Sequence, residues 1–234
     1  MARDDTTVVP LPAGTQLRIT SRSGRVAVTG EARDDVLVEG RTARVSTSPD
    51  GVEVDVASGA VTVRCPTGTD VLVGAASGAV ELRGVLGDAR VTTESGGITV
   101  EEVGRLDARS RSGSIRVERC AGNCRARADS GRVSITQAGS VEVAAASGSV
   151  EADAVGDASI RAGSGKVTVG LTRPGDVAIE VHSGSVDVTL PPGVCPACDL
   201  ASHSGRVNRE FEPGDDGSIR VRTGSGTVTV RNRG

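Results

Sequence analysis

The chain has 234 residues, a formal net charge of −3, and Phe211 as its only aromatic residue. A net charge this close to zero indicates neither a strongly anionic nor a strongly cationic partner. No run approaches the roughly 18 apolar residues that a membrane span requires. The odd number of cysteines argues against a closed disulfide framework. The apolar residues are mostly valine and alanine, interspersed with 32 glycines, which favours short strands over helices.

The first predicted element is an N-terminal cap or arm, residues 1–14, in which Pro10 and Pro12 interrupt a short apolar run. This segment lacks the apolar stretch of a secretory signal peptide. We therefore expect a cytoplasmic protein, whose five cysteines would remain reduced.

A Ser-Gly dipeptide then recurs along the chain, and a fixed period of this kind indicates a repeat architecture. One gap spans 35 residues, and the other spacings run from 17 to 21 residues. Gly40 stands where a further corner is expected inside the gap, which gives 12 corners in all. The dipeptides begin at Ser23, Ser58, Ser77, Ser95, Ser112, Ser130, Ser147, Ser164, Ser183, Ser204 and Ser225.

Each repeat predicts two strands and two corners. With the serine as position 0, apolar or small residues recur at −6, −4, +3 and +5, as do Ala89, Val91, Ile98 and Val100 around Ser95. This alternation buries one face of each strand. We therefore predict an all-β fold in which residues 15–234 form one parallel β-solenoid domain of about 12 rungs of 17–21 residues. Parallel crossovers are right-handed by default, so the solenoid is expected to be β-helix-like and right-handed.

A second topology fits the same apolar columns. Two-residue Ser-Gly hairpins would connect an up-and-down sheet of about two dozen antiparallel strands. One open sheet of that size would leave its valine face exposed to water. The solenoid is therefore the favoured topology.

Cys195 and Cys198 lie between the only two histidines, His182 and His203. Cysteine and histidine are the residue types that bind structural zinc. The repeat register argues against a shared site, because Cys198 takes the inward −6 position with Val177 above it, whereas both histidines take the outward −1 position. We expect no metal and no cofactor, and retain these four residues as weak metal candidates. A redox role for the cysteine pair remains a further alternative.

The other three cysteines predict no special chemistry. Cys120 and Cys124 flank a corner and are interpreted as a loop thiol and a core thiol, which would form a local disulfide only under oxidising conditions. Cys65 is interpreted as a corner residue.

Arginines concentrate between residues 105 and 132, where eight of them accompany three acidic residues. A basic stripe on adjacent rungs could bind an anionic partner. A solvated face of mixed charge is the favoured interpretation, and the lack of aromatic side chains for base stacking argues against nucleic acid. The candidate surface for an anionic partner comprises Arg90, Arg105, Arg109, Arg125, Arg127 and Arg161.

The repeated SGxVxV units, the opening LPAGTQLRITSRSGRVAVTG and the late LPPG…LASHSGRV resemble the bacterial putative-adhesin family of β-strand repeats, grouped with the Toastrack domains. The resemblance covers residues 8–232 and implies a β-helix-like stack without established enzymatic activity. Some relatives occur with envelope-stress signalling modules, which leaves envelope association open. The chain departs from the family in its missing secretion signal, its Cys-Pro-Ala-Cys insertion, and Arg209 at a normally apolar +5 position.

The expected function is therefore non-enzymatic: an adhesin-like repeat protein that presents a surface to a protein partner, with a link to envelope or signalling partners. One alternative is a self-assembling scaffold or filament, because solenoid ends expose unpaired strand edges and the C-terminal GSGTVTVRNRG has no bulky cap. A carbohydrate-active solenoid enzyme is the other alternative. It is disfavoured because carboxylates are scattered rather than clustered in repeated pairs.

Overall fold

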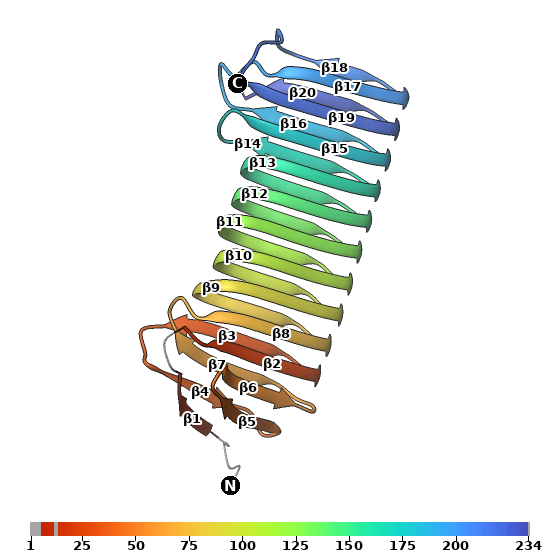
Figure 1. Ribbon diagram of the computed structural model, residues 1–234. Coiled ribbons are helices and arrows are strands. Elements are labelled where there is room, and N and C mark those ends of the chain that lie inside the picture. The colour runs from red at the N-terminus through yellow and green to blue at the C-terminus, as the bar shows by residue number, and fades with distance from the viewer. Residues whose placement is uncertain (1–5, 12–13, 234) are drawn as a thin grey trace.

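A computed structural model describes residues 6–11 and 14–233, and the chain forms a rod of stacked coils built from strands alone (Figure 1). Within these ranges there is no helix that could cross a membrane. The strands are β1 (Thr6–Pro10), β2 (Gln16–Ser23), β3 (Val26–Glu31), β4 (Asp35–Glu39), β5 (Ala43–Ser48), β6 (Gly51–Val56), β7 (Val61–Pro66), β8 (Asp70–Ser77), β9 (Val80–Ser95), β10 (Ile98–Ser112), β11 (Ile115–Ser130), β12 (Val133–Ser147), β13 (Val150–Ser164), β14 (Val167–Leu171), β15 (Gly175–Ser183), β16 (Val186–Leu190), β17 (Ala197–Ser204), β18 (Val207–Arg209), β19 (Gly217–Ser225) and β20 (Val228–Asn232).

Parallel pairing between successive coils decides between the two predicted topologies. Ser112 lies beside Ser95 on one side and Ser130 on the other, so equivalent positions of the repeat stack directly. Pairing across a Ser-Gly hairpin would instead be antiparallel. The β-solenoid is confirmed, and the hairpin-connected sheet is wrong.

The core is a continuous column of small aliphatic side chains between the two arms of each coil. We call the residues before the corner serine the leading arm and those after it the trailing arm. In β12, Val133 and Ile135 of the trailing arm and Val141 and Val143 of the next leading arm are all buried. Burying such a side chain contributes about 1.5–3 kcal/mol, so stability accumulates coil by coil.

The corner glycines form a ladder in which each backbone lies against the next. A Cβ built on Gly148 would lie 1.9 Å from the carbonyl oxygen of Gly131, and the φ of Gly148 is +119°. Such a contact is closer than a side chain tolerates, and this φ is one that L-residues rarely adopt. The Ser-Gly corner is therefore a requirement of coil stacking as well as of the turn itself.

The coils do not stack in sequence order at either end of the rod. Near the N-terminus, β2 pairs with both β6 and β8, and β3 pairs with both β7 and β9. Near the C-terminus, β19 pairs with both β15 and β17, and β20 pairs with both β16 and β18. The first and last coils in the sequence are thus each the second coil in space.

The predicted parallel corner at Gly40 is wrong. β4 runs antiparallel to β7, β1 runs antiparallel to β4, and β5 runs antiparallel to β6. Val36 and Val38 still face the core, as their alternation predicted, but they reach it from strands of opposite direction. These strands close the N-terminal end of the rod (Figure 1). The predicted arm at residues 1–14 falls partly outside the described residues, and its β1 belongs to this closing layer.

At the other end the outermost coil is β17 and β18, rather than the C-terminal strand that the sequence pointed to. All three residues of β18 are exposed. The following segment lies beside the residues that precede β17, where the backbone N–H of Asp216 donates to the carbonyl oxygen of Cys195 at 3.1 Å, and its Phe211 packs against the core. Arg209, on β18, adds a charge to the outermost strand, which discourages pairing with another chain.

Aspartates at the second corner of the coil join neighbouring coils. Oδ1 of Asp70 accepts the backbone N–H of Asp88 at 2.8 Å, and Oδ1 of Asp157 accepts that of Asp176 at 3.0 Å. Asp157 also forms an ion pair with Arg173 at 2.9 Å. The backbone hydrogen bond and the arginine together lower the pKa of Asp157.

Replacing Asp157 with asparagine should reduce stability at neutral pH by under about 1 kcal/mol, since partly exposed ion pairs are weak. A lowered folded-state pKa contributes stability above the unfolded pKa of roughly 3.9, and this contribution disappears as the pH falls through the folded pKa. The difference between the wild-type chain and D157N should therefore vanish in acid. Urea unfolding at a series of pH values measures it, and a difference that is independent of pH would contradict the assignment.

Candidate interaction face

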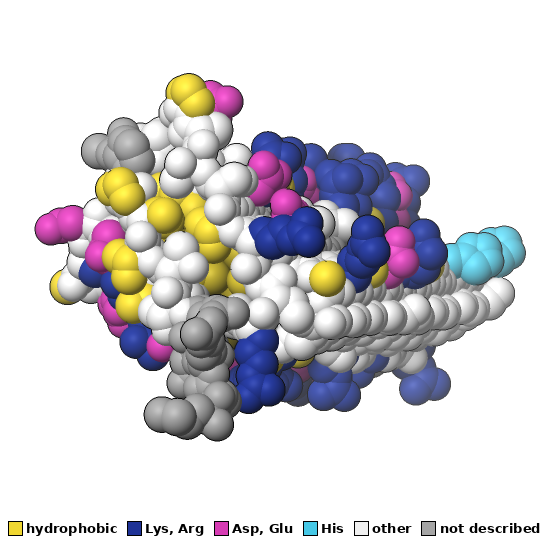
Figure 2. All heavy atoms as spheres, turned by 90° about the horizontal axis from the view of Figure 1, so that it is seen from below, with side chains coloured by type: hydrophobic (Ala, Val, Ile, Leu, Met, Phe, Trp, Pro, Cys, Tyr) yellow, Lys and Arg dark blue, Asp and Glu magenta, His cyan; other side chains and the backbone are white. Residues whose placement is uncertain are grey.

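The predicted arginines lie on the outward side of the leading arms. We call this side of the rod the groove face, after the groove described below. Arg90 and Arg125 take position −5, whereas Arg109, Arg127 and Arg161 take position −3. Arg105 lies at the adjacent corner, beside Asp88. Viewed along the rod, basic side chains gather on more than one side of the molecule and are interspersed with acidic ones (Figure 2).

Acidic neighbours accompany five of these six arginines. Arg127 alone among them has no hydrogen bond or ion pair from its side chain within the described part of the chain. The ion pairs are Arg90–Asp107 at 3.6 Å, Arg105–Asp88 at 3.8 Å, Arg109–Asp107 at 3.1 Å, Arg161–Glu180 at 3.4 Å, and Arg125–Glu142 in direct contact. The structure therefore brings the predicted residues to one side of the rod as a face of mixed charge.

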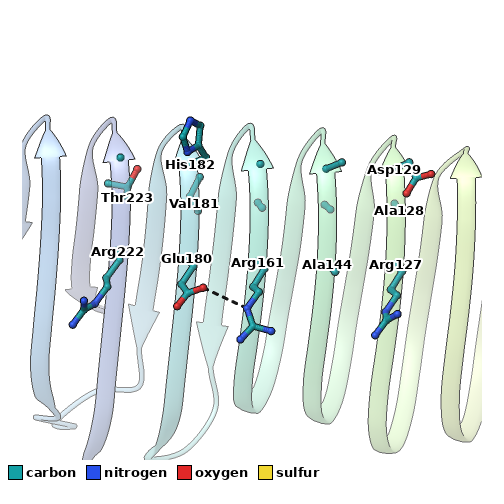
Figure 3. A pocket seen from close by; sticks show the side chains of 15 residues that line it. Arg127, Ala128, Asp129, Ala144, Arg161, Glu180, Val181, His182, Arg222 and Thr223 are labelled. Carbon is teal, nitrogen blue, oxygen red and sulfur yellow. Dashed lines mark hydrogen bonds and ion pairs between the residues drawn. The ribbon is translucent and has the colours of Figure 1, made fainter.

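A shallow groove of about 760 Å³ crosses this face over five coils. Its hollow arises because small residues occupy outward positions where other coils carry long side chains: Ala144 at −3, and Ala146, Gly163 and Gly224 at −1. Arg127, Arg161 and Arg222 rise beside it, with Glu180 between the last two (Figure 3). The groove can hold an extended segment that runs across successive coils.

The four weak metal candidates do not meet. His182 and His203 both point outward beside corner serines, but β19 lies between their strands and places Gly224 between them. Cys198 faces inward on the outermost coil, beside Ile219, and Cys195 precedes that strand. Within the described residues no three His, Cys, Asp or Glu side chains form a group that could hold a metal ion.

The register expected for Cys198 needs a correction. Val177 lies beside Ile219 rather than beside Cys198, because β19 separates the two strands. Cys198 consequently has a neighbouring strand on one side only and is half-buried. This burial raises the pKa of its thiol.

The three remaining cysteines are core residues, which corrects the interpretation of Cys65 and Cys120 as corner or loop thiols. Cys65, Cys120 and Cys124 are at most 1% exposed. Hydrogen bonding between the thiols of Cys120 and Cys124 lowers the pKa of Cys120 and, together with burial, raises that of Cys124. Burial raises the pKa of Cys65 to about 11.

Thiol labelling should separate these two classes of cysteine. In the folded protein we expect iodoacetamide to modify Cys195 and Cys198 at least about tenfold faster than Cys65, Cys120 and Cys124, because burial denies the reagent access to the three core thiols. Denaturant should make all five react at similar rates. Peptide mass spectrometry over time measures this, and rapid native modification of Cys120 would contradict its burial.

Sequence reasoning missed the groove, although the signal was present in the small residues at 144, 146 and 163. It also missed the position of Arg222. Consecutive numbering places the coil of residues 197–204 beside β15, whereas β19 occupies that place and brings Arg222 next to Glu180. No local pattern marks this exchange.

A profile of the Toastrack family DUF4097 matches residues 1–190. The chain belongs to the Toastrack family. The family match and the parallel coils agree on a repeat β-solenoid, as the sequence motifs predicted.

Two solved structures are similar to this Toastrack chain over nearly their whole length. One is a putative adhesin from Bacteroides fragilis NCTC 9343, with 14% identity, a TM-score of 0.48, and coverage of 97% of this chain and 96% of that one. The other is a putative cell adhesion protein from Clostridium sporogenes ATCC 15579, with 8% identity, a TM-score of 0.27, and coverage of 99% and 100%. The chain matches no curated protein sequence. The assignment rests on the family profile.

Proposed function

We propose that this Toastrack chain is a non-enzymatic, adhesin-like rod that binds a protein partner through its groove face. The observation that carries the proposal is the groove of about 760 Å³, which combines a floor of small residues with flanking arginines over five coils. A floor of alanine and glycine admits the backbone of a partner closely, and flanking arginines supply directional hydrogen bonds to it.

The two ends of the rod favour lateral binding over end-to-end assembly. At the N-terminal end, antiparallel strands replace the parallel coil that a second rod would have to continue. At the C-terminal end, Arg209 places a charge on the outermost strand, and the segment containing Phe211 packs against the core beside the last coil. These features are typical of protected sheet edges and argue against the filament alternative.

A site-specific photo-crosslinking amino acid tests the proposal in the native host. Placed at Ala146 in the groove, it should form an adduct with a defined protein, and the adduct should decrease when Arg161 is replaced by glutamate. Placed at Thr99, which is exposed on the trailing arm, it should not form that adduct. The same adduct from both positions, or none from Ala146, would contradict the proposal. Fractionation of the same cells tests a further part of the proposal, a cytoplasmic location for the rod, against an envelope location.

A further inference from the structure

Charges along the groove alternate in one outward column, with a single interruption. Position −3 of five successive coils is occupied by Arg127, Ala144, Arg161, Glu180 and Arg222, each paired in register with the next. Opposite charges on neighbouring strands attract, whereas like charges directly opposite each other repel. The column thus has an acid between Arg161 and Arg222, and an alanine between Arg127 and Arg161 (Figure 3).

Glu180 shows what an acid does in this column. Its Oε2 lies 3.4 Å from Nε of Arg161, one coil away, so a carboxylate at position −3 reaches the guanidinium of the adjacent coil. Stacked strands lie about 4.8 Å apart, so the two arginines that flank Ala144 start about 9.6 Å from each other. A carboxylate between them can approach both guanidinium groups at hydrogen-bonding distances of about 2.8 Å.

On one side of Ala144 a positive charge of the groove is left without an acidic contact. On the side away from Ala144, Arg127 lies beside Arg109, whose side chain bonds instead to Asp107 at 3.1 Å. Arg127 itself has neither an ion pair nor a side-chain hydrogen bond within the described residues. A like-charged neighbour and no acidic contact leave its guanidinium available to an external anion.

We infer that the position over Ala144 receives the carboxylate of an aspartate or glutamate side chain from the protein partner, held between Arg127 and Arg161. This inference rests on the proposed function and names the chemistry that the groove recognises. The partner's carboxylate would lie between Arg127 and Arg161, just as the carboxylate of Glu180 lies between Arg161 and Arg222.

An acidic protein segment fits the charges around Ala144 better than a uniformly charged polymer does. Asp129 and Glu142 lie within one coil of the position and Glu180 lies two coils away, and these acids would repel closely spaced phosphates or sulfates on either side of it. The face also lacks aromatic side chains, on which single-stranded nucleic acids usually stack. A single carboxylate flanked by neutral residues meets neither obstacle.

Binding of a fluorescent peptide with one central glutamate among glycine and serine residues, measured by anisotropy at low salt, tests the inference. We expect R127A to weaken binding at least about fivefold and A144E at least about tenfold, because A144E supplies the missing acid from the chain itself. A144Q introduces a side chain of the same shape as that of A144E but without its charge, and it should weaken peptide binding less than about threefold. The control is R116A: Arg116 is exposed on the trailing arm and has no side-chain partner among the described residues, so its loss should have less than about a twofold effect. Far-UV circular dichroism confirms that each variant is folded.

Equal loss with A144Q and A144E would overturn the inference, since shape rather than charge would then decide binding. Tighter binding of heparin or single-stranded DNA than of the glutamate peptide, with the same dependence on Arg127, would overturn it in favour of a polyanion. Failure here is distinguishable from failure of the proposed function: if the crosslinked adduct at Ala146 persists in A144E, the groove binds a protein without this carboxylate contact.

Discussion

Alanine in place of Gly148 should destabilise the rod by roughly 3 kcal/mol or more, a large effect for one methyl group. The added Cβ would lie 1.9 Å from the carbonyl oxygen of Gly131, and the φ of +119° is itself unfavourable for alanine. The neighbouring atom is backbone in a hydrogen-bonded ladder, so relief requires two coils to separate. Urea unfolding followed by far-UV circular dichroism measures the change.

Two further glycines separate the contributions to this effect. Gly59 also has a positive φ, +91°, but no atom lies within 4 Å of its added Cβ, so G59A should show the conformational strain alone, about 1–2 kcal/mol. Gly74 has neither feature, and G74A should be nearly neutral or slightly stabilising. Equal effects of G148A and G74A would mean that coil stacking does not require the corner glycine.

Aspartate in place of Val221 should destabilise the C-terminal coils by about 4 kcal/mol, whereas L200D should have an effect of about 1 kcal/mol. The two residues share position −4 and lie side by side in β19 and β17. Val221 is fully buried between two coils, so its aspartate would be an unpaired buried charge. Leu200 is half-buried on the outermost coil, where an aspartate can reach water.

This comparison tests the exchanged order of the coils directly. Stacking in sequence order would place Leu200 inside and Val221 at the end, so the ranking of the two variants would reverse. Hydrogen exchange by mass spectrometry gives the same information locally. V221D should increase the exchange of the backbone amides in β17 and β18 as well as in β19, because β19 and β20 are the strands on which the outermost coil, β17 and β18, is stacked. In a repeat protein, coils far from the substitution should stay protected.

The sequence predicts the repeated part of the fold well because the relevant interactions are local. Alternation within six residues identifies the buried face, and the Ser-Gly corner sets the register of each coil against its neighbour. Val91 and Val143, for example, are buried as their −4 position requires. The six candidate arginines also lie on the expected outward side, since outward columns follow from the same alternation.

The order of coils at the two ends could not be predicted in this way. Because every coil presents nearly the same valine pattern, Val26 can pair equally well with Val61 or with Val80, and in the structure it pairs with both. The reversed strands around Gly40 keep the same alternation as parallel ones, so their direction leaves no trace in the apolar pattern. The second corner has no fixed motif, which is why the burial of Cys65 and Cys120 was missed.

The exchanged C-terminal coil also has a mechanical consequence. β20 is hydrogen-bonded along its length to β16 on one side and is paired with β18 on the other. A force applied to the chain beyond Asn232 would therefore have to slide a strand out from between two neighbours, shearing two ladders together, instead of peeling a terminal strand away bond by bond. A rod tethered through this end would resist tension better than one whose last strand formed the open edge.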